Sequence, residues 1–380
     1  MQRINLKPVA PFITGAFLLF LLVSTGCQKT NDKIISEGDT LQALTKKKPK
    51  SLKDFEQVNL VGNNDEYDPA HIDPMLINGW GIAFSPNGIA WVSSQGGHIS
   101  AVYNSEGELI PARPAVAIPS PGATTGGNPT GAVFNGSEDF KLSNGDAARF
   151  LFVGVDGIIS GWNAAAVNNA LVIKNNSATS AYTGVTIAMN NGVNHLYAAD
   201  FRAGRIDVYD NNFNSVNFPF SDPDLPAGYS PFNIKNFGGK LYVTYAKVGP
   251  DGESAAHPGD GYIDIYNTDG TLVNRFASRG QLNAPWGIAR ADASFFEDDI
   301  SGLPATSILV GNFGDGHINV YSETGAYLGQ LRKHGQPIVI EGLWEIIFAP
   351  STSSIDHGRL YFAAGPDDEQ EGLFGYIQKQ

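Results

Sequence analysis

The chain contains very little sulfur, with one cysteine and three methionines among 380 residues. A single cysteine excludes an intramolecular disulfide and a zinc site built from paired cysteines, so stability must come from packing and backbone hydrogen bonds. The Gly-x-Ser-x-Gly, His-Glu-x-x-His and Walker patterns are also missing. No two acidic residues have a spacing that nominates a general acid and a general base. The sequence therefore indicates no catalytic class.

Long apolar runs are scarce too, and the most prominent one lies at residues 12–23, between the basic residues Arg3 and Lys7 and the small residues 24–26. About twelve apolar residues are too few to span a bilayer core, which needs about twenty. A positive start, a short apolar run and small residues before a cleavage point are typical of an export signal. We therefore predict a signal peptide over residues 1–26.

The cysteine directly follows this cleavage point. The sequence Val-Ser-Thr-Gly-Cys, which ends at Cys27, resembles a bacterial lipobox, although Ser24 stands where leucine is usual. We expect lipidation of Cys27 to anchor the protein in the membrane, because two lipid signals suffice for stable anchoring. This places the protein in the bacterial cell envelope, and Gln28 after the cysteine favours the outer membrane. The alternative is an ordinary secreted protein with a stray cysteine.

Basic charge is concentrated at the start of the chain. Residues 1–53 hold nine lysines and arginines against three acids, a net charge of +6. Because the whole chain has a net charge of −13, residues 54–380 have a net charge of −19. We expect residues 27–53, which include the lysine-rich run 46–50, to form a disordered tether ahead of a folded domain over residues 54–380. A domain so acidic repels nucleic acid, and we expect no nucleic-acid partner.

Six copies of one pattern recur about every 50 residues in the folded domain. Each opens with a short apolar strand closed by a turn: WGIAFSP at Trp80, TGAVFNG at Thr130, GVTIAMN at Gly184, FNIKNFG at Phe232, WGIARAD at Trp286 and WEIIFAP at Trp344. A second strand follows in each copy. A third alternates β-branched and aromatic residues, as in IDVY, IDIY and INVY. Weaker fourth strands follow in the first five copies, so we predict four-stranded units.

The sixth copy has no fourth strand of its own, because the chain ends three residues after Ile377. A lone strand at residues 55–61 precedes the first copy. We expect it to pair with the last unit and close a ring, which removes exposed sheet edges. The predicted fold is therefore all-β, a six-bladed β-propeller whose last blade is completed by the N-terminal strand.

Residues 55–376 also carry a long series of motifs in a fixed order. They include HIDP, NGWGIAFSPNG, PTGAVFNGSEDF, ARFLFVGVDGIISGWN, DFRAGRIDVYD, GGKLYVTYAK, SRGQLNAPWGIA, VGNFGDGHINVY, LGQLR and AAGPDDEQEGLFG. In this order they resemble a family of exported bacterial proteins with no assigned activity. The resemblance implies an NHL-like propeller, here a lipoprotein member, and carries over no functional residues.

Candidate binding residues lie in the loops on one face of the ring, which receives the connections before the first strands and between the second and third strands. Asn78, Asn128, Asn283 and Glu341 precede first strands, and other loops supply His71, Asp73, Asp156, Asp200, Arg202, Lys247, Asn312, Asp315, Asp367 and Asp368. The presence of each of these residues, taken alone, is also explained by a role in a turn or in capping a loop. Amide and carboxylate oxygens suit a hard cation, so Asn78, Asn128, Asn283 and Glu341 are a candidate Ca²⁺ site at the channel mouth.

Three functions remain open. The first is an envelope-anchored binding or scaffold module whose channel face takes a small molecule, a glycan or a protein. The second is a metal-dependent, lactonase-like hydrolase with its site at the channel, an expectation from fold analogy alone. The third is a structural surface protein. For Trp80, Trp286 and Trp344, which share one repeat position, we expect packing between blades rather than substrate stacking.

Overall fold

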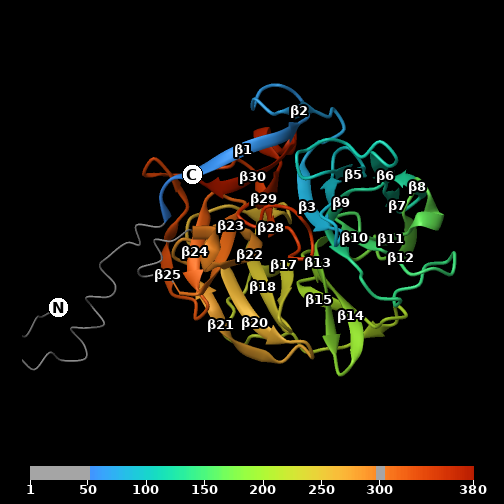
Figure 1. Cartoon of the computed structure of the whole chain (residues 1–380). Coiled ribbons are helices and arrows are strands. Elements are labelled where there is room, and N and C mark those ends of the chain that lie inside the picture. The colour runs from blue at the N-terminus through green and yellow to red at the C-terminus, as the bar shows by residue number, and fades with distance from the viewer. Residues whose placement is uncertain (1–51, 297–303) are drawn as a thin grey trace, which may run out of the picture. The chain divides into compact units, whose positions relative to one another are not determined.

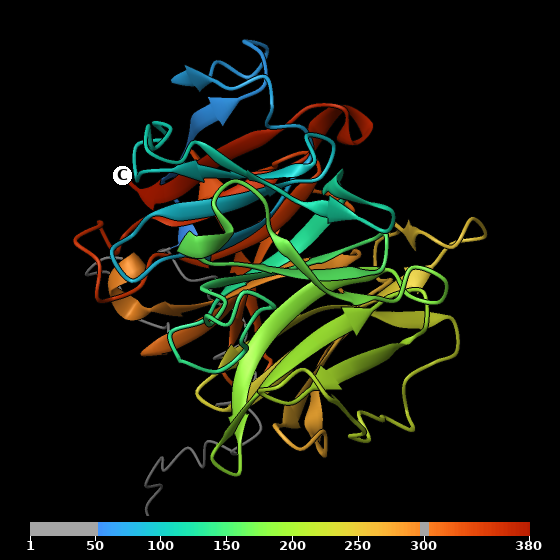
Figure 2. The ribbon, with the colours of Figure 1, turned by 90° about the vertical axis from the view of Figure 1, so that its right-hand side faces the viewer.

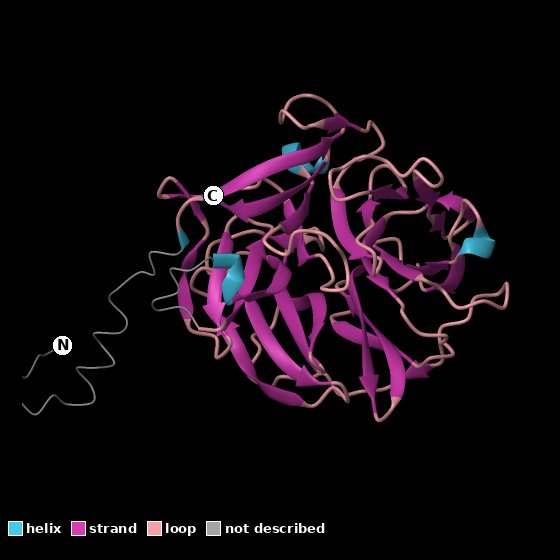
Figure 3. Cartoon of the chain, viewed as in Figure 1, coloured by secondary structure: helices cyan, strands magenta, loops and turns pink. Residues whose placement is uncertain are grey.

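The computed structural model describes residues 52–296 and 304–380. The predicted signal peptide, Cys27 and nearly all of the predicted tether lie outside the described residues. The described chain is almost entirely strands and loops, with only short helical turns (Figure 3). No helix in this part is long and apolar enough to cross a bilayer.

The described strands form six sheets of four or more strands, and the predicted six-bladed β-propeller is confirmed (Figure 1). The first blade consists of β3 (Gly79–Phe84), β4 (Ala90–Ser94), β5 (Ile99–Tyr103) and β6 (Ala115–Ala117), and the second of β9 (Pro129–Phe134), β10 (Phe150–Gly154), β11 (Ile158–Trp162) and β12 (Leu171–Asn175). The third consists of β13 (Tyr182–Asn190), β14 (Val193–Asp200), β15 (Arg205–Tyr209) and β16 (Ser215–Val216), and the fourth of β17 (Tyr229–Phe237), β18 (Lys240–Val248), β20 (Tyr262–Asn267) and β21 (Leu272–Ser278). The fifth consists of β22 (Pro285–Asp292), β23 (Thr306–Asn312), β24 (Ile318–Ser322) and β25 (Tyr327–Gln330).

Small elements decorate this frame. β19 (Ser254–Ala255) pairs with β18, and two short hairpins join β7 (Pro119–Ser120) to β8 (Ala123–Gly126) and β26 (Arg332–Lys333) to β27 (Gln336–Pro337). The helical turns are η2 (Ala164–Ala166), η3 (Ala293–Phe296) and α2 (Pro366–Glu369).

The last blade joins the two ends of the folded domain. Its strands are β28 (Leu343–Phe348), β29 (Leu360–Ala364), β30 (Leu373–Lys379), β1 (Phe55–Gly62) and β2 (His71–Ile72). β1 pairs antiparallel with β30, from Phe55 opposite Lys379 to Gly62 opposite Leu373, and the two strands lie side by side in Figures 1 and 2. The predicted ring closure is therefore confirmed. Packing begins slightly earlier than predicted, because Leu52, at the end of the expected tether, is buried in the core.

The core is divided among the gaps between neighbouring blades. Among the described residues, six apolar clusters each join one blade to the next around the ring, and a seventh lies at the channel. The inner strands approach closely because four of the six repeats have glycine at one position. A Cβ on Gly131 would lie 2.9 Å from the Val185 backbone nitrogen, and one on Gly184 only 2.2 Å from Asn233 Oδ1. These contacts fix the spacing of the strands that line the channel.

Candidate functional site

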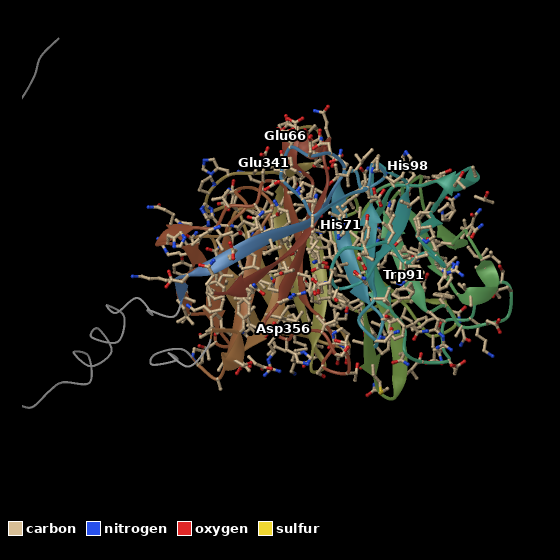
Figure 4. All side chains as sticks on the ribbon, turned by 45° about the horizontal axis from the view of Figure 1, so that its top comes forward. Glu66, His71, Trp91, His98, Glu341 and Asp356 are labelled. Carbon is tan, nitrogen blue, oxygen red and sulfur yellow. The ribbon has the colours of Figure 1, made fainter. Side chains whose placement is uncertain are left out.

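The six inner strands (β3, β9, β13, β17, β22 and β28) run in the same direction around the axis, so the channel has two distinct ends. The upper end carries the loops that precede these strands, with Glu341, and the loops between second and third strands, with His98. The lower end carries the loops that follow the inner strands, with Asp356. Figure 4 shows Glu341 and His98 at the top and Asp356 near the bottom. The sequence analysis placed all candidate ligands at the upper end.

The four residues of the predicted Ca²⁺ site have other partners in the structure. Asn78, fully buried, accepts a hydrogen bond from Trp344 Nε1 at 2.9 Å through Oδ1. Asn128 Oδ1 accepts one from Gln95, and Glu341 Oε1 accepts one from the Asp367 amide. Asn283 donates to Asp315 Oδ2. No hydrogen bond joins any two of the four, and calcium binding there stays a prediction that calorimetric titration of the metal-stripped protein tests.

The other predicted residues are spread over separate loops. His71 pairs with Val61 at the outer edge of the last blade, away from the inner strands. Asp73 Oδ2 accepts a hydrogen bond from the buried Tyr103 hydroxyl. Asp200 Oδ1 accepts from the Ala181 and Ala203 amides, and burial raises the pKa of this carboxyl group. Asp315 Oδ1 accepts from the His317 amide and from Asn312 Nδ2.

The remaining loop residues bind within their own turns or to nearby loops. Asp156 Oδ2 accepts a hydrogen bond from the Asn128 amide, Lys247 contacts Asp260, and Arg202 donates to the Ser180 carbonyl. Asp367 and Asp368 are exposed, and both have the left-handed backbone, with φ of 52° and 50°. These hydrogen bonds shape single loops or join neighbouring ones. They bring Asn283, Asn312 and Asp315 together, and a binding role for the predicted residues stays a prediction.

Aromatic side chains fill the upper end of the channel. Trp80 stacks on Trp344 with ring centroids 3.6 Å apart, and Phe313 also stacks on Trp344, with ring centroids 3.9 Å apart. Trp286 meets Trp344 edge-on at 5.9 Å, and Phe232 of the fourth blade joins them. These residues come from the first, fourth, fifth and sixth blades, so the cluster crosses the axis. The tryptophans pack against one another between blades, as expected from the sequence.

A buried ion pair also spans non-adjacent blades. Lys235 on β17 places Nζ 2.6 Å from Oε2 of Glu345 on β28, although β22 lies between these strands in the ring. The Glu345 side chain is 1 % exposed and that of Lys235 is 14 % exposed. Burial raises the pKa of Glu345, and the ammonium group of Lys235 opposes that shift. Glu345 Oε1 makes no hydrogen bond within the described residues.

A cavity of 380 Å³ opens at the lower end and is lined by residues of all six inner strands. Lys235 is among them, as are Phe84, Phe134, Phe237 and Phe348. The phenylalanines end their strands, so they lie nearest the mouth, and Lys235 lies deeper. An apolar cavity of a few hundred Å³ with a few polar groups is typical of a small-molecule site. This lower end therefore has the form of a ligand site, and binding at the upper face stays a prediction.

Lys235 and Glu345 were not among the residues predicted from the sequence, although the repeats contain a signal. When the six inner strands are aligned, Glu345 falls where four repeats have glycine, and Lys235 falls where the others have Ala83, Val133, Thr186, Ala289 and Ile347. A charged residue at a position that is otherwise small or apolar marks a departure from the repeat. The pattern does not show that the two charges meet.

Comparison with known proteins identifies relatives in a giant virus. No family model matches the chain. Protein L690 of Acanthamoeba polyphaga mimivirus, described as uncharacterised, is 36% identical over 342 residues, which cover 85% of this chain and 86% of the relative. Protein R648 of the same virus, also uncharacterised, is 34% identical over 339 residues, covering 85% and 80%. The bacterial and exported character that the motifs implied has no support in these relatives.

Solved structures with a similar course of the chain share little sequence with it. A streptogramin B lyase is 14% identical with a TM-score of 0.49, covering 86% of this chain and 97% of the lyase. The gluconolactonase XC5397 of Xanthomonas campestris is 17% identical with a TM-score of 0.41, covering 61% and 73%. Neither likeness carries an argument about activity, and the lactonase-like and structural alternatives stay predictions.

Proposed function

This chain belongs to one family with the mimivirus proteins L690 and R648, and from that premise we propose that it is an envelope-anchored propeller that binds a small molecule in the lower channel cavity. The observation that carries the proposal is the 380 Å³ cavity lined by all six inner strands. At about 30 Å³ for a group the size of water, the cavity holds roughly a dozen heavy atoms. The family premise assigns no activity by itself.

The lining selects the chemistry of the ligand. The phenylalanines at the mouth favour a ligand with an apolar body, because burying apolar surface gains about 25 cal/mol per Å². Lys235 has three N–H donors; its ammonium group pairs with Glu345 and lies 5.9 Å from the centre of the Trp286 ring. The remaining donors suit a carboxylate, since hydrogen bonds between charged groups are about twice as strong as neutral ones. We infer a ligand with an apolar body and one carboxylate, such as a medium-chain acid.

Displacement of a fluorescent anion tests this assignment. 1-Naphthoate, a fluorescent dye with an apolar ring system and one carboxylate, is close in size to the roughly dozen heavy atoms that the cavity holds; it is bound to the protein and then displaced by octanoate or by octanol. These two competitors differ mainly in the charged head group. Native protein is expected to release the dye at octanoate concentrations at least about tenfold below those of octanol. Val133→Trp, which fills the cavity, is expected to abolish displacement by both competitors.

The role of Lys235 needs a variant that leaves no buried unpaired charge, because breaking such a pair costs about 3–5 kcal/mol. The double variant Lys235→Met/Glu345→Gln removes both charges and is expected to bind octanoate and octanol alike. Lys240→Met, an exposed lysine of the same blade, is the matched control and is expected to keep the native preference. Equal displacement by both competitors in native protein would overturn the role of Lys235, and no displacement would overturn the cavity as a site.

Anchoring through Cys27 is a separate part of the proposal. It is supported by the lipobox-like sequence around the single cysteine and by the basic segment that follows it. Cys27→Ser is expected to leave the protein soluble in the envelope or retained as an uncleaved precursor. Metabolic labelling with a palmitate analogue measures the modification directly. Unchanged membrane association of a correctly processed Cys27→Ser protein would contradict lipidation.

A further inference from the structure

A second cavity, of 540 Å³, lies between the second and third blades. Its walls come from β12 on one side and from β15 and β16 on the other, together with the loop before β13. None of the residues that line it belongs to an inner strand, so it is separate from the channel. At about 30 Å³ for a group the size of water, it holds roughly eighteen heavy atoms.

A directed hydrogen-bond network forms one wall of this inter-blade pocket. The Tyr182 hydroxyl donates to Asp207 Oδ2 at 2.8 Å, and Asn176 Nδ2 donates to the hydroxyls of Tyr182 and Tyr209 at 2.7 and 3.0 Å. Because the single proton of Tyr182 is committed to Asp207, Tyr209 must be the donor in its 3.2 Å contact with Tyr182. Each hydrogen bond determines the donor and acceptor roles in the next one, so the polar groups of this wall are preorganised for a ligand.

The network leaves specific acceptors for a ligand. Tyr209 accepts one hydrogen bond, from Asn176, and keeps a second lone pair. Asn176 Oδ1 makes no hydrogen bond within the described part of the chain. The exposed Thr179 lines the same cavity and supplies a hydroxyl group. These groups match a ligand that presents several hydroxyl donors and acceptors close together.

One cation of the pocket has no acidic partner among the described residues. Arg205 Nε donates to Asp207 Oδ1 at 2.6 Å, and Arg205 also lies 3.7 Å from Oδ2 of the buried Asp200, so its charge is balanced. Lys174 Nζ lies 5.7 Å from the centre of the Tyr209 ring and forms no ion pair within the described part of the chain. Lys174 is therefore the cation that can pair with an anionic group of a ligand.

We propose that the inter-blade pocket binds an acidic saccharide, meaning a sugar unit that carries a carboxylate. The carboxylate pairs with Lys174, and the ring hydroxyls bond to Asn176, Tyr209 and the Thr179 hydroxyl. The half-buried Phe218 and Val216 line the same cavity and give the apolar face of a sugar ring a surface to pack against. Lys174 presents donors that an uncharged apolar ligand would leave unpaired, at a cost of about 1–3 kcal/mol.

Calorimetric titration of the native protein tests the proposal with three probes: a galacturonate disaccharide, of which one sugar unit occupies the pocket and the other extends into solvent, the neutral galactose disaccharide and inorganic sulfate. We expect the galacturonate disaccharide to bind at least about tenfold more tightly than the neutral one, and sulfate to compete only weakly. Lys174→Met is expected to remove the preference for the acidic sugar. Lys141→Met, an exposed lysine of the same blade region, makes the same change in net charge and is expected to bind as the native protein does.

Tyr209→Phe separates recognition of hydroxyls from recognition of charge. It is expected to weaken both disaccharides severalfold while leaving competition by sulfate unchanged. Equal affinity for the two disaccharides would overturn the role of Lys174. Sulfate competing as well as the acidic sugar would reduce the site to one for simple anions, and no heat at millimolar sugar would overturn it altogether. Displacement of the dye from the channel by octanoate is a separate readout, so failure here leaves the channel proposal intact.

Discussion

The pairing of β1 with β30 predicts that the two ends of the propeller can be locked covalently. Glu56 lies directly opposite Gln378, and directly paired strand residues have Cα atoms about 4.5–5.5 Å apart. A disulfide needs about 4.4–6.8 Å between the same atoms. Replacing both residues by cysteine, in a chain that carries Cys27→Ser, gives a protein whose only two thiols face each other across this pair of strands.

The expected stabilisation follows from the length of chain that the bond encloses. Residues 56 and 378 bracket a loop of about 320 residues, for which loss of entropy in the unfolded chain gives about 5–6 kcal/mol. Measured disulfides deliver up to about 5 kcal/mol, because strain in the folded state subtracts from this figure. We therefore expect the oxidised variant to gain about 3–5 kcal/mol in free energy of unfolding over the same protein in reductant.

Urea unfolding with and without reductant measures the gain, and migration on a non-reducing gel shows whether the ring has closed within one molecule. Val58→Cys with Gln378→Cys is the matched control. Its diagonal spacing is about 7–8 Å, which is beyond the reach of an unstrained disulfide. Failure of the 56–378 pair to oxidise, or equally rapid oxidation of the control, would refute the register of β1 against β30.

Three further predictions concern single side chains. Burial raises the pKa of Asp264 to about 6, above its usual 3.8, so the folded state holds the proton more tightly. The stability that the protonated Asp264 carboxyl group contributes is complete below pH 4 and falls by up to about 3 kcal/mol as the pH rises to 6. Urea unfolding of Asp264→Asn should show a smaller change in the free energy of unfolding over this pH range. Asn78→Ala removes both the acceptor of Trp344 Nε1 and the donor to Glu369 Oε2 at a position with φ of 48°, and thermal and urea unfolding should show a loss of about 2–4 kcal/mol. Gly184→Ala forces β13 away from Asn233 and should cost about 1–3 kcal/mol, and an unchanged melting temperature would contradict the close approach of these strands.

The architecture was predictable because the sequence of each blade contains the same local pattern. Strand alternation, glycine-rich turns and a repeat of about 50 residues appear in every copy, so an uncertain strand in one blade is supported by its counterparts. Ring closure followed from the same logic, since residues 55–61 form an unpaired strand and the sixth copy lacks one. The position of each loop relative to the two faces also follows from antiparallel pairing alone.

The sites were harder to predict, because their residues come from different blades. Asn78, Asn128, Asn283 and Glu341 share a place in the repeat, yet they bind different side chains and backbone groups of other segments, such as Trp344 of β28 for Asn78 and Asp315 for Asn283. The inter-blade pocket was missed for a similar reason. Residues 205–209, RIDVY, read as a strand pattern, and nothing in that pattern shows that Asp207 and Tyr209 meet Tyr182 and Asn176 from other segments.

The sequence by itself determined the strands, their order, the number of blades and the strand that closes the ring, because these depend on local periodicity and on a count of repeats. Only the tertiary structure decided which end of the channel is filled and which is open. Side chains of equivalent repeat positions meet around the axis, and their sizes and charges there differ from blade to blade. Three tryptophans fill one end, whereas Lys235 reaches Glu345 across a gap of 110 residues and leaves a cavity toward the other. Contacts of this kind depend on how the ring curves in space, and no local pattern in the chain specifies them.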